Sequence, residues 1–414
     1  MTSTKPQTVV IVGAGIAGLS AAFHLADRQV RRIVLLDKDK IGSGSSSSIR
    51  SGAVNTMLQG TEATSRARGI SFDIFERFNR ILDDYEFHQV GCLGIYTPQQ
   101  FKSAAQLHDM QRSAGARFEV LSTAELEARF PDMHLKDGEC GVLDLRGGYS
   151  EPDRYIPVLA AKVRALGVEI SEDETVEDFL LEGGNVRDVR LRGGEELRAD
   201  ATVCTVKAWA NSLLARVGQP LPVRNVVHER FVTKPIGRPI RLPAVNDDAI
   251  GIYYRPTERG GLLLGADGGE SAQVEPGPDF DMAELEPTPG ILAFIREAAP
   301  ARLPFLGDVE IDYHRVGLIS CTVDLVPNIG PVESLPDLYL ATNFCSGGFG
   351  YHPVAGLILA EYILDGDTSI DAREFSPDRF KDFDTQGFLG HDMTRHDMVE
   401  AVAAKTRGYV RKRH

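Results

Sequence analysis

The start of the chain constrains its fold most strongly, because it orders a buried strand, a glycine-rich turn and a helix. The strand is the continuous β-branched run Thr8 to Val12, which leads into Gly13-Ala14-Gly15-Ile16-Ala17-Gly18. An alanine-rich amphipathic helix to about Arg28 and a second strand, Ile33 to Leu36, follow before Asp37. This order and spacing are typical of a Rossmann-type dinucleotide site.

Each part of this motif has a mechanical reason. The first glycine allows a tight turn, the second lets a pyrophosphate approach the backbone, and the third lets helix and strand pack closely. The helix begins at this turn, and its free N–H groups and positive dipole end attract phosphate. The acid that ends the second strand can accept hydrogen bonds from ribose hydroxyls. The predicted contacts in this half of the site are Gly13, Gly15, Ile16, Ala17, Gly18, Asp37 and Lys38.

Charge and hydropathy narrow the class of protein. The 414 residues carry 45 basic and 59 acidic side chains, a net charge of −14, which disfavours nucleic acid and anionic membranes as partners. We see no apolar run as long as a membrane span and no secretion signal, so we expect the cytoplasm. The length allows two cores, or one large discontinuous domain with a second domain inserted.

The cysteines and histidines do not suggest a metal. Five cysteines are scattered without a C-x-x-C pair, so we predict neither a disulfide framework nor a zinc site, and we interpret most of them as small buried residues. His391 and His396 do not share a helix face at i,i+4, so we interpret the His/Asp cluster there as a solvated helix or an oligomer contact.

Four later segments say more about the cofactor. A serine-rich loop, Gly42 to Gly52, follows the first motif and can donate hydrogen bonds to a diphosphate. Gly147 to Asp153 leads into a helix from Tyr155 to Leu166 and then into strands near Val176. A buried strand, Ala201 to Val206, precedes Lys207-Ala208-Trp209. Near the end, the strand Leu338 to Thr342 runs into Asn343 to Pro353, and a helix from Val354 to Leu364 follows.

Together these segments resemble the D-amino-acid-oxidase/sarcosine-oxidase (DAO) superfamily of FAD-dependent oxidoreductases, from about residue 7 to 385. The subgroup that looks most similar contains sarcosine oxidase β-subunits and dimethylglycine or proline dehydrogenases. In that family the C-terminal Gly-Gly-Phe-Gly segment lies under the flavin ring, where its amides and helix dipole can stabilise reduced flavin. The resemblance therefore implies FAD, with further contacts at Ser45, Ser46, Arg50, Val176, Gly347, Gly348, Phe349 and Gly350.

The resemblance also implies an architecture. We expect an α/β fold whose Rossmann-type FAD-binding domain is discontinuous, built from residues 1–82, 148–215 and 318–385. An inserted substrate domain with an antiparallel sheet would take residues 83–147 and 216–317. Residues 386–414 would form a C-terminal extension.

The family reaction removes a hydride from a carbon next to nitrogen and passes it to FAD N5. We therefore expect a small amine, amino acid or imino acid as substrate, and O₂ or another acceptor to reoxidise the flavin. Arg50 matches a family arginine near the flavin. Tyr253 matches a pocket aromatic, although ordinary packing explains it equally well. His352 is either a carboxylate ligand or base or a structural histidine, and Tyr351 is either a site residue or packing. Arg255 and Arg315 are weaker candidates for carboxylate binding, and we interpret them as surface ion pairs.

Departures from the family pattern carry further expectations. Gly317 occupies the position of the covalent-flavin cysteine of monomeric sarcosine oxidase. Ser48 and Ile49 offer no histidine where dimethylglycine dehydrogenases attach flavin, so we predict noncovalent FAD. Leu263 replaces the oxygen-activating lysine, which favours a dehydrogenase. Gly350 replaces the lysine that binds the substrate carboxylate, so either that ligand differs or the substrate is not a simple N-methyl amino acid. Lys207 replaces a glycine; it either compensates for a missing cation or, as we favour, faces solvent.

Other functions stay open from the sequence. An FAD-dependent 2-hydroxy-acid dehydrogenase would use the same scaffold. A third hypothesis, after amine oxidation and 2-hydroxy-acid oxidation, is a flavin-bound noncatalytic assembly factor, and a subunit of a homo- or hetero-oligomer is a related possibility.

Overall fold

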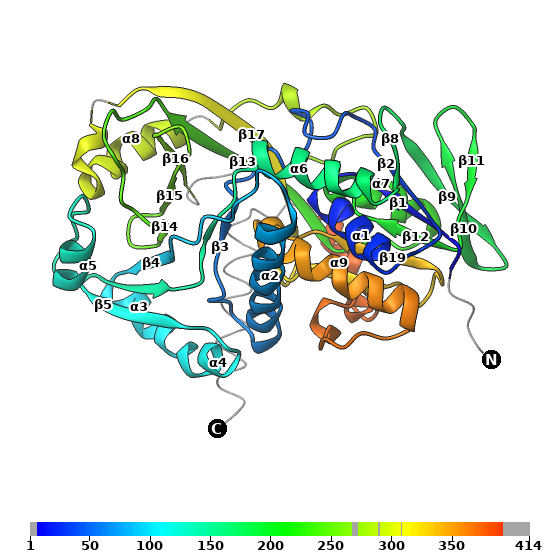
Figure 1. The fold of residues 1–414 in the computed structure, drawn as a ribbon, viewed down its shortest axis with the longest axis horizontal. Coiled ribbons are helices and arrows are strands. Elements are labelled where there is room, and N and C mark those ends of the chain that lie inside the picture. The colour runs from blue at the N-terminus through cyan, green and yellow to red at the C-terminus, as the bar shows by residue number, and fades with distance from the viewer. Residues whose placement is uncertain (1–5, 267–271, 289, 308, 392–414) are drawn as a thin grey trace.

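The computed structural model describes residues 6–266, 272–288, 290–307 and 309–391. Its two large sheets lie at opposite ends of the molecule in Figure 1, with helix α2 (Glu62–Ile81) in front between them. We predicted a C-terminal extension that contains a solvated helix or an oligomer contact. Its residues from 392 onward, including His396, lie outside the described residues.

The first sheet is the Rossmann-type sheet that the N-terminal motif predicts. Its strand order is β18-β19-β12-β1-β2-β8, and every pair is parallel except β18 with β19. The parallel pairs place the ends of β1 and β12 side by side, where the glycine turn begins. The strands are β1 (Thr8–Val12), β2 (Arg32–Leu36), β8 (Glu169–Ser171), β12 (Ala201–Cys204), β18 (Asn328–Pro331) and β19 (Leu338–Thr342).

Both faces of this sheet are buried, which explains the unbroken apolar strands. In β1, Val9 and Ile11 join the core on one face, whereas Val10 and Val12 join the core on the other, as the two-residue period of a strand requires. One face carries α1 (Ile16–Asp27), α2, α6 (Pro152–Ala165) and α9 (Gly348–Asp365). The other carries α7 (Ala210–Leu214) and a small antiparallel sheet of β9 (Val176–Glu182), β10 (Asn185–Leu191) and β11 (Glu196–Arg198).

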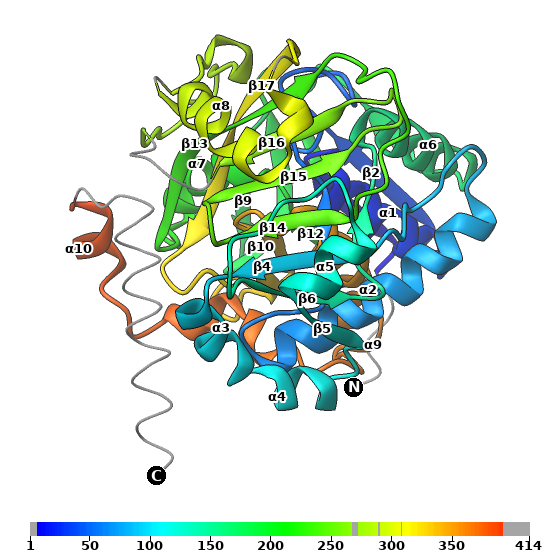
Figure 2. The same cartoon turned by 90° about the vertical axis from the view of Figure 1, so that its left-hand side faces the viewer.

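The second sheet has the order β17-β13-β16-β15-β14-β4-β6-β5 and faces the viewer in Figure 2. It is not wholly antiparallel as predicted, because β4 and β14 pair in parallel where the two separate chain segments meet. Its strands are β4 (Cys92–Tyr96), β5 (Phe118–Ser122), β6 (Cys140–Asp144), β13 (Val223–Thr233), β14 (Ala244–Asp247), β15 (Ile252–Pro256), β16 (Leu262–Ala266) and β17 (Ile311–Thr322).

Short helices and a two-stranded ribbon complete the described fold. They are α3 (Pro98–Ala105), α4 (His108–Ser113), α5 (Thr123–Arg129), α8 (Ile291–Arg302), α10 (Thr385–Leu389), and β3 (Val54–Asn55) paired with β7 (Gly148–Tyr149). Among the described residues, no helix is long and apolar enough to cross a membrane.

The strands of the two large sheets fall on the two sides of the predicted domain division, apart from the end of β17 beyond residue 317. The domain boundaries themselves stay a prediction. Helix α9 begins six residues before the predicted start at Val354 and contains Pro353. Proline lacks the N–H that would bond the carbonyl of Phe349, and His352 Nδ1 donates to that carbonyl instead, over 3.0 Å.

Candidate cofactor and active site

Two adjoining hollows run from the glycine turn toward the second sheet. The first is bordered by the ends of β1 and β2 and by the serine-rich loop. The second is bordered by that loop, the start of α9 and residues of β13, β14, β15 and β17. Five residues line both hollows and mark where they meet: Gly15, Ser47, Ser48, Thr205 and Lys207. An extended dinucleotide fits such a pair of joined hollows.

The glycine turn is shaped as the motif predicts. Gly13 has φ of 102°, in the left-handed region that favours glycine. A Cβ on Gly18 would collide with the carbonyl oxygen of Gly13, so close packing of helix and strand requires glycine there. Gly15, the N-cap residue of α1, has no side chain that could cap the helix. The Ser48 hydroxyl instead accepts a hydrogen bond from the amide of Ile16 over 3.2 Å. The glycine turn borders both hollows, and Ile16 and Ala17 line the second hollow.

Asp37 and Lys38 line the first hollow, as predicted for the adenosine half. The Asp37 carboxylate accepts from the amides of Ala14 (2.6 Å) and Asp39 (3.0 Å), which ties the two strand ends together. Burial raises the pKa of this carboxyl. The Lys38 ammonium lies 4.3 Å from the Trp209 ring centroid and donates to the carbonyl of Phe280 (2.9 Å).

The serine-rich loop borders both hollows. Ser45 and Ser46 line the first hollow, as does Val176 from β9. The Ser45 hydroxyl shares a 2.7 Å hydrogen bond with Ser43. The loop therefore presents hydroxyls along the path that a diphosphate would take. Ser48 lies where the two hollows meet, and the sequence pattern did not predict it as a cofactor contact.

The start of α9 forms one wall of the second hollow, with Gly347, Gly348 and Phe349 lining it. The predicted contact Gly350 differs from its neighbours: it does not line the hollow, because the space beside it is filled by the guanidinium of Arg68 from α2. The helix geometry explains this difference, since successive residues of a helix face different directions.

Arg50 lines the second hollow as predicted, but its guanidinium is partly engaged. It donates to the carbonyls of Gly44 and Val316, and burial lowers its pKa. A Cβ on Gly317 would lie 3.3 Å from Cβ and Cδ of Arg50. The position of the family's covalent-flavin cysteine is therefore packed against this arginine.

Tyr253 from β15 lines the second hollow together with His228 from β13. Their rings stack with centroids 5.7 Å apart, and the Tyr253 hydroxyl lies 2.9 Å from Nε2 of His228. A Cβ on Gly265 would collide with the Tyr253 ring, so that glycine allows the ring its position. His228 is absent from the sequence predictions because no local motif marks it; only strand pairing brings it to Tyr253.

Tyr351 also lines the second hollow, as predicted. Its hydroxyl lies 3.4 Å from Oε1 of Gln59, and its ring faces the Arg68 guanidinium at 3.9 Å.

The surroundings of His352 distinguish between the two interpretations given for it. Its side chain is fully buried and does not line either hollow. It lies among Phe75, Tyr155 and Phe349, and burial lowers its pKa to about 3. With Nδ1 donating to the Phe349 carbonyl, Nε2 accepts from the Tyr155 hydroxyl over 2.7 Å. Its burial and its two hydrogen-bond partners favour the interpretation of His352 as a structural histidine of α9.

Lys207 also departs from expectation, because it does not face bulk solvent. It is half-buried at the start of the short 3₁₀ helix Lys207–Trp209 and lines both hollows. Its φ of 45° shows why glycine suits this position in the family. Desolvation lowers the pKa of its ammonium to about 8.

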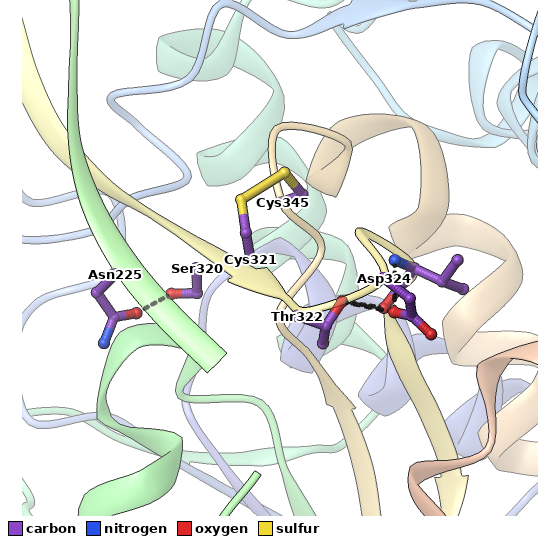
Figure 3. The surroundings of a disulfide bond; sticks show 7 residues. Asn225, Ser320, Cys321, Thr322, Asp324 and Cys345 are labelled. Carbon is purple, nitrogen blue, oxygen red and sulfur yellow. Dashed lines mark hydrogen bonds between the residues drawn. A yellow bond between two sulfur atoms is a disulfide. The ribbon is translucent and has the colours of Figure 1, made fainter. Parts of the chain in front are cut away.

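A disulfide joins Cys321 at the end of β17 to Cys345 in the loop before α9 (Figure 3), contrary to the expectation of unpaired cysteines. The two segments adjoin, since the amide of Cys345 donates to the Ser320 carbonyl over 3.0 Å. A separation of 24 residues with no flanking motif explains why the sequence pattern did not reveal the pair. Cys92, Cys140 and Cys204 are free thiols.

Both weaker arginine candidates form ion pairs, but the expectation of a surface pair is wrong for Arg255, whose side chain is in the interior. Arg255 is buried and pairs with Glu151 at 2.9 Å, and Arg315 pairs with Asp153 at 2.8 Å. Among the described residues, no group of three or more His, Cys, Asp or Glu side chains is arranged to hold a metal ion.

Similar proteins of known family identify the family to which this chain belongs. The family model described as "FAD dependent oxidoreductase" (DAO) matches residues 8–362. The 4-methylaminobutanoate oxidase (formaldehyde-forming) of Paenarthrobacter nicotinovorans is 27% identical over 94% of this chain and 46% of its own length. The sarcosine oxidase subunit beta of Rhizobium meliloti is 26% identical over 93% of this chain and 90% of its own.

Among solved structures, L-proline dehydrogenase from P. horikoshii superposes with a TM-score of 0.83 and 26% identity, covering 91% of this chain and 98% of that one. The chain spans about half the length of the first curated relatives it matches, at 46% and 44%. Positions 48, 49 and 317, where the resemblance places flavin attachment in some relatives, hold serine, isoleucine and glycine. The chain therefore belongs to the DAO family of FAD-dependent oxidoreductases, and its cofactor is noncovalently bound FAD.

Proposed function

We propose that this chain oxidises a C–N bond in a small secondary amine, amino acid or imino acid. The observation that carries the proposal is the second hollow, which joins the dinucleotide turn to the face of the second sheet. A substrate lying there would be enclosed between the start of α9 and the His228–Tyr253 pair. Relatives named for sarcosine, 4-methylaminobutanoate and L-proline oxidation support the same class of chemistry.

The residues present fit FAD in a defined order. The glycine turn, Asp37 and the serine-rich loop would hold the adenosine and diphosphate, and the start of α9 would lie beside the flavin. FAD, when bound, supplies the hydride acceptor. The amides at the positive end of α9 favour negative charge near them.

The chain's own part in the chemistry is to place the amine and manage its proton. A protonated amine cannot release a hydride from the adjacent carbon, so the ammonium must first lose a proton. His228 can accept that proton, and the Tyr253 hydroxyl, 2.9 Å from its Nε2, orients the ring. We assign Tyr253 and His228 to this role, with Arg50 and Tyr351 bordering the same space.

The test is an anaerobic screen of amines, amino acids, imino acids and 2-hydroxy acids that follows bleaching of the FAD absorbance. The expected result is bleaching by an amine, with release of ammonia or a smaller amine from an acyclic substrate, or with formation of a cyclic imine or its ring-opened amino carbonyl product from a cyclic imino acid. Bleaching by 2-hydroxy acids alone would replace the proposal with 2-hydroxy-acid oxidation. No bleaching by any compound would favour a noncatalytic subunit.

We propose further that the electron acceptor is not O₂. Leu263 stands at the family's oxygen-activating lysine position, is buried, and packs with Val232 and Tyr253. A cation near the flavin assists the formation of superoxide, and this position supplies none, although Arg50 and Lys207 line the same hollow. The reduced enzyme should reoxidise slowly in air and quickly with an artificial acceptor. Hydrogen peroxide formed at the rate of substrate loss would contradict this.

A further inference from the structure

Residues 277–280 form a strap that reaches from the second sheet to the first hollow. The chain on both sides of this strap is fixed to the second sheet. Before it, the amide of Val274 donates to the carbonyl of Asn225 in β13 over 2.9 Å. After it, Met282 is fully buried in the cluster that contains Val227 of β13. The strap itself is mostly exposed, so it is a short surface segment between two firm anchors.

The strap closes the first hollow from outside. Pro278 lines that hollow, and it is the only described lining residue that follows Arg216 in the chain. The other lining residues belong to the ends of β1 and β2, the glycine turn, the serine-rich loop and the segments around Val176 and Trp209. One part of the chain therefore builds the adenosine half of the site, and a strap from a distant part covers it.

Two side chains of the first hollow hold the strap in place, and together they form its latch. The Trp209 indole donates to the carbonyl of Gly277 over 3.0 Å. The Lys38 ammonium donates to the carbonyl of Phe280 over 2.9 Å and lies 4.3 Å from the Trp209 ring centroid. The Phe280 ring packs against Trp209 with centroids 6.5 Å apart. Both latch side chains line the hollow that the strap covers.

These contacts are individually weak. A third contact of the strap is the ion pair of Asp279 with Arg192 at 2.6 Å, in which the Asp279 side chain is 82% exposed. Such a pair is screened by solvent and contributes little to stability. A single hydrogen bond is also a modest net contribution. Weakly held surface segments open locally while the core stays folded, and the two anchors allow this strap to do so.

We propose that the strap opens to admit and release FAD and closes over its adenosine half, with Trp209 and Lys38 as the latch. This inference concerns cofactor exchange and does not depend on which substrate is oxidised. Because the latch bonds join protein groups only, weakening them speeds entry and release by the same factor and leaves the Kd for FAD unchanged. Loss of a direct FAD contact would instead speed release alone and raise the Kd.

Exchange can be measured on the holoenzyme. Protein loaded with radiolabelled FAD is chased with excess unlabelled FAD, and equilibrium dialysis gives the Kd. Phe280→Ala removes the ring that packs on Trp209, at a residue that lines neither hollow. Trp209→Phe removes the indole N–H but keeps a ring beside Lys38. Each variant should speed exchange by about 3- to 10-fold, with an unchanged Kd.

Phe294→Ala is the matched control, because Phe294 on α8 is 39% exposed and lines neither hollow. It should exchange FAD at the wild-type rate. Equal acceleration in this control would show general loosening of the protein and would overturn the strap.

Two other results would also overturn the proposal. One is an unchanged exchange rate in both Phe280→Ala and Trp209→Phe. The other is a Kd that rises by the same factor as the release rate, because these residues would then act as FAD contacts. Should Trp209→Phe fail to hold FAD, Phe280→Ala and Asp279→Asn decide by the same comparison. Asp279→Asn removes only the exposed ion pair and should speed exchange by about 2-fold at an unchanged Kd.

Discussion

At the scale of single residues, Lys207 allows a prediction about cofactor binding. Its ammonium lines both hollows where a diphosphate would cross between them. The pKa of about 8 in the free protein should rise when an anion binds beside it. FAD affinity should therefore be constant below pH 8 and fall as the pH rises above 8, because the deprotonated lysine must then regain its proton. Lys207→Met should bind FAD more weakly at pH 7 and lack this decline, as measured by quenching of FAD fluorescence.

Other charged groups near this lysine do not mimic the effect. Burial lowers the pKa of Arg50, but an arginine stays protonated in a protein, so Arg50 does not change charge just above pH 8. Lys102, exposed on α3, provides the matched control Lys102→Met. If Lys207→Met binds FAD as tightly as wild type at pH 7, the ammonium does not contact the diphosphate.

His352 gives a second prediction at this scale. Replacing it with leucine leaves the Phe349 carbonyl and the Tyr155 hydroxyl unpaired in the core, which should cost about 2 kcal/mol of unfolding free energy. Asparagine can still donate to that carbonyl and should recover part of the loss. Denaturant unfolding measures both, and the rate of flavin reduction per bound FAD should not change. A lost reduction rate at normal stability would restore a catalytic role.

At the scale of elements, the Cys321–Cys345 disulfide ties β17 to the loop before α9. Closing 24 residues of chain should stabilise the fold by about 3 kcal/mol. Reductant should lower the unfolding free energy of wild type by this amount and leave Cys345→Ser unaffected, while Cys140→Ser should respond like wild type. Protein unfolded without reductant should show three reactive thiols per chain. Five would mean that the bond does not form.

The elements also show what sequence reasoning can and cannot reach. Contiguous patterns predicted β1, β19 and the glycine turn, because strand period, turn and helix start are all local. The start of α9 was placed too late, because Pro353 reads as a helix break in the sequence, whereas in the structure it lies inside α9 and His352 donates to the carbonyl of Phe349 that the proline leaves without its usual donor. His228, Arg68 and the disulfide escaped prediction because each depends on segments far apart in the sequence. Lys207 was expected to face solvent, because the hollows that it lines are likewise formed by segments far apart in the sequence.

At the scale of the whole molecule, FAD should couple segments that the chain order separates. The two hollows are lined by the first turn, the serine-rich loop, strands of the second sheet and the start of α9. A ligand that binds only the folded state stabilises it by about 2.7 kcal/mol at 100 times its Kd. ADP should fill the first hollow alone. In hydrogen exchange, ADP should therefore protect residues 13–18 but not 347–350, whereas FAD should protect both. Protection of both by ADP would show that the two regions are coupled through the protein core, without the flavin.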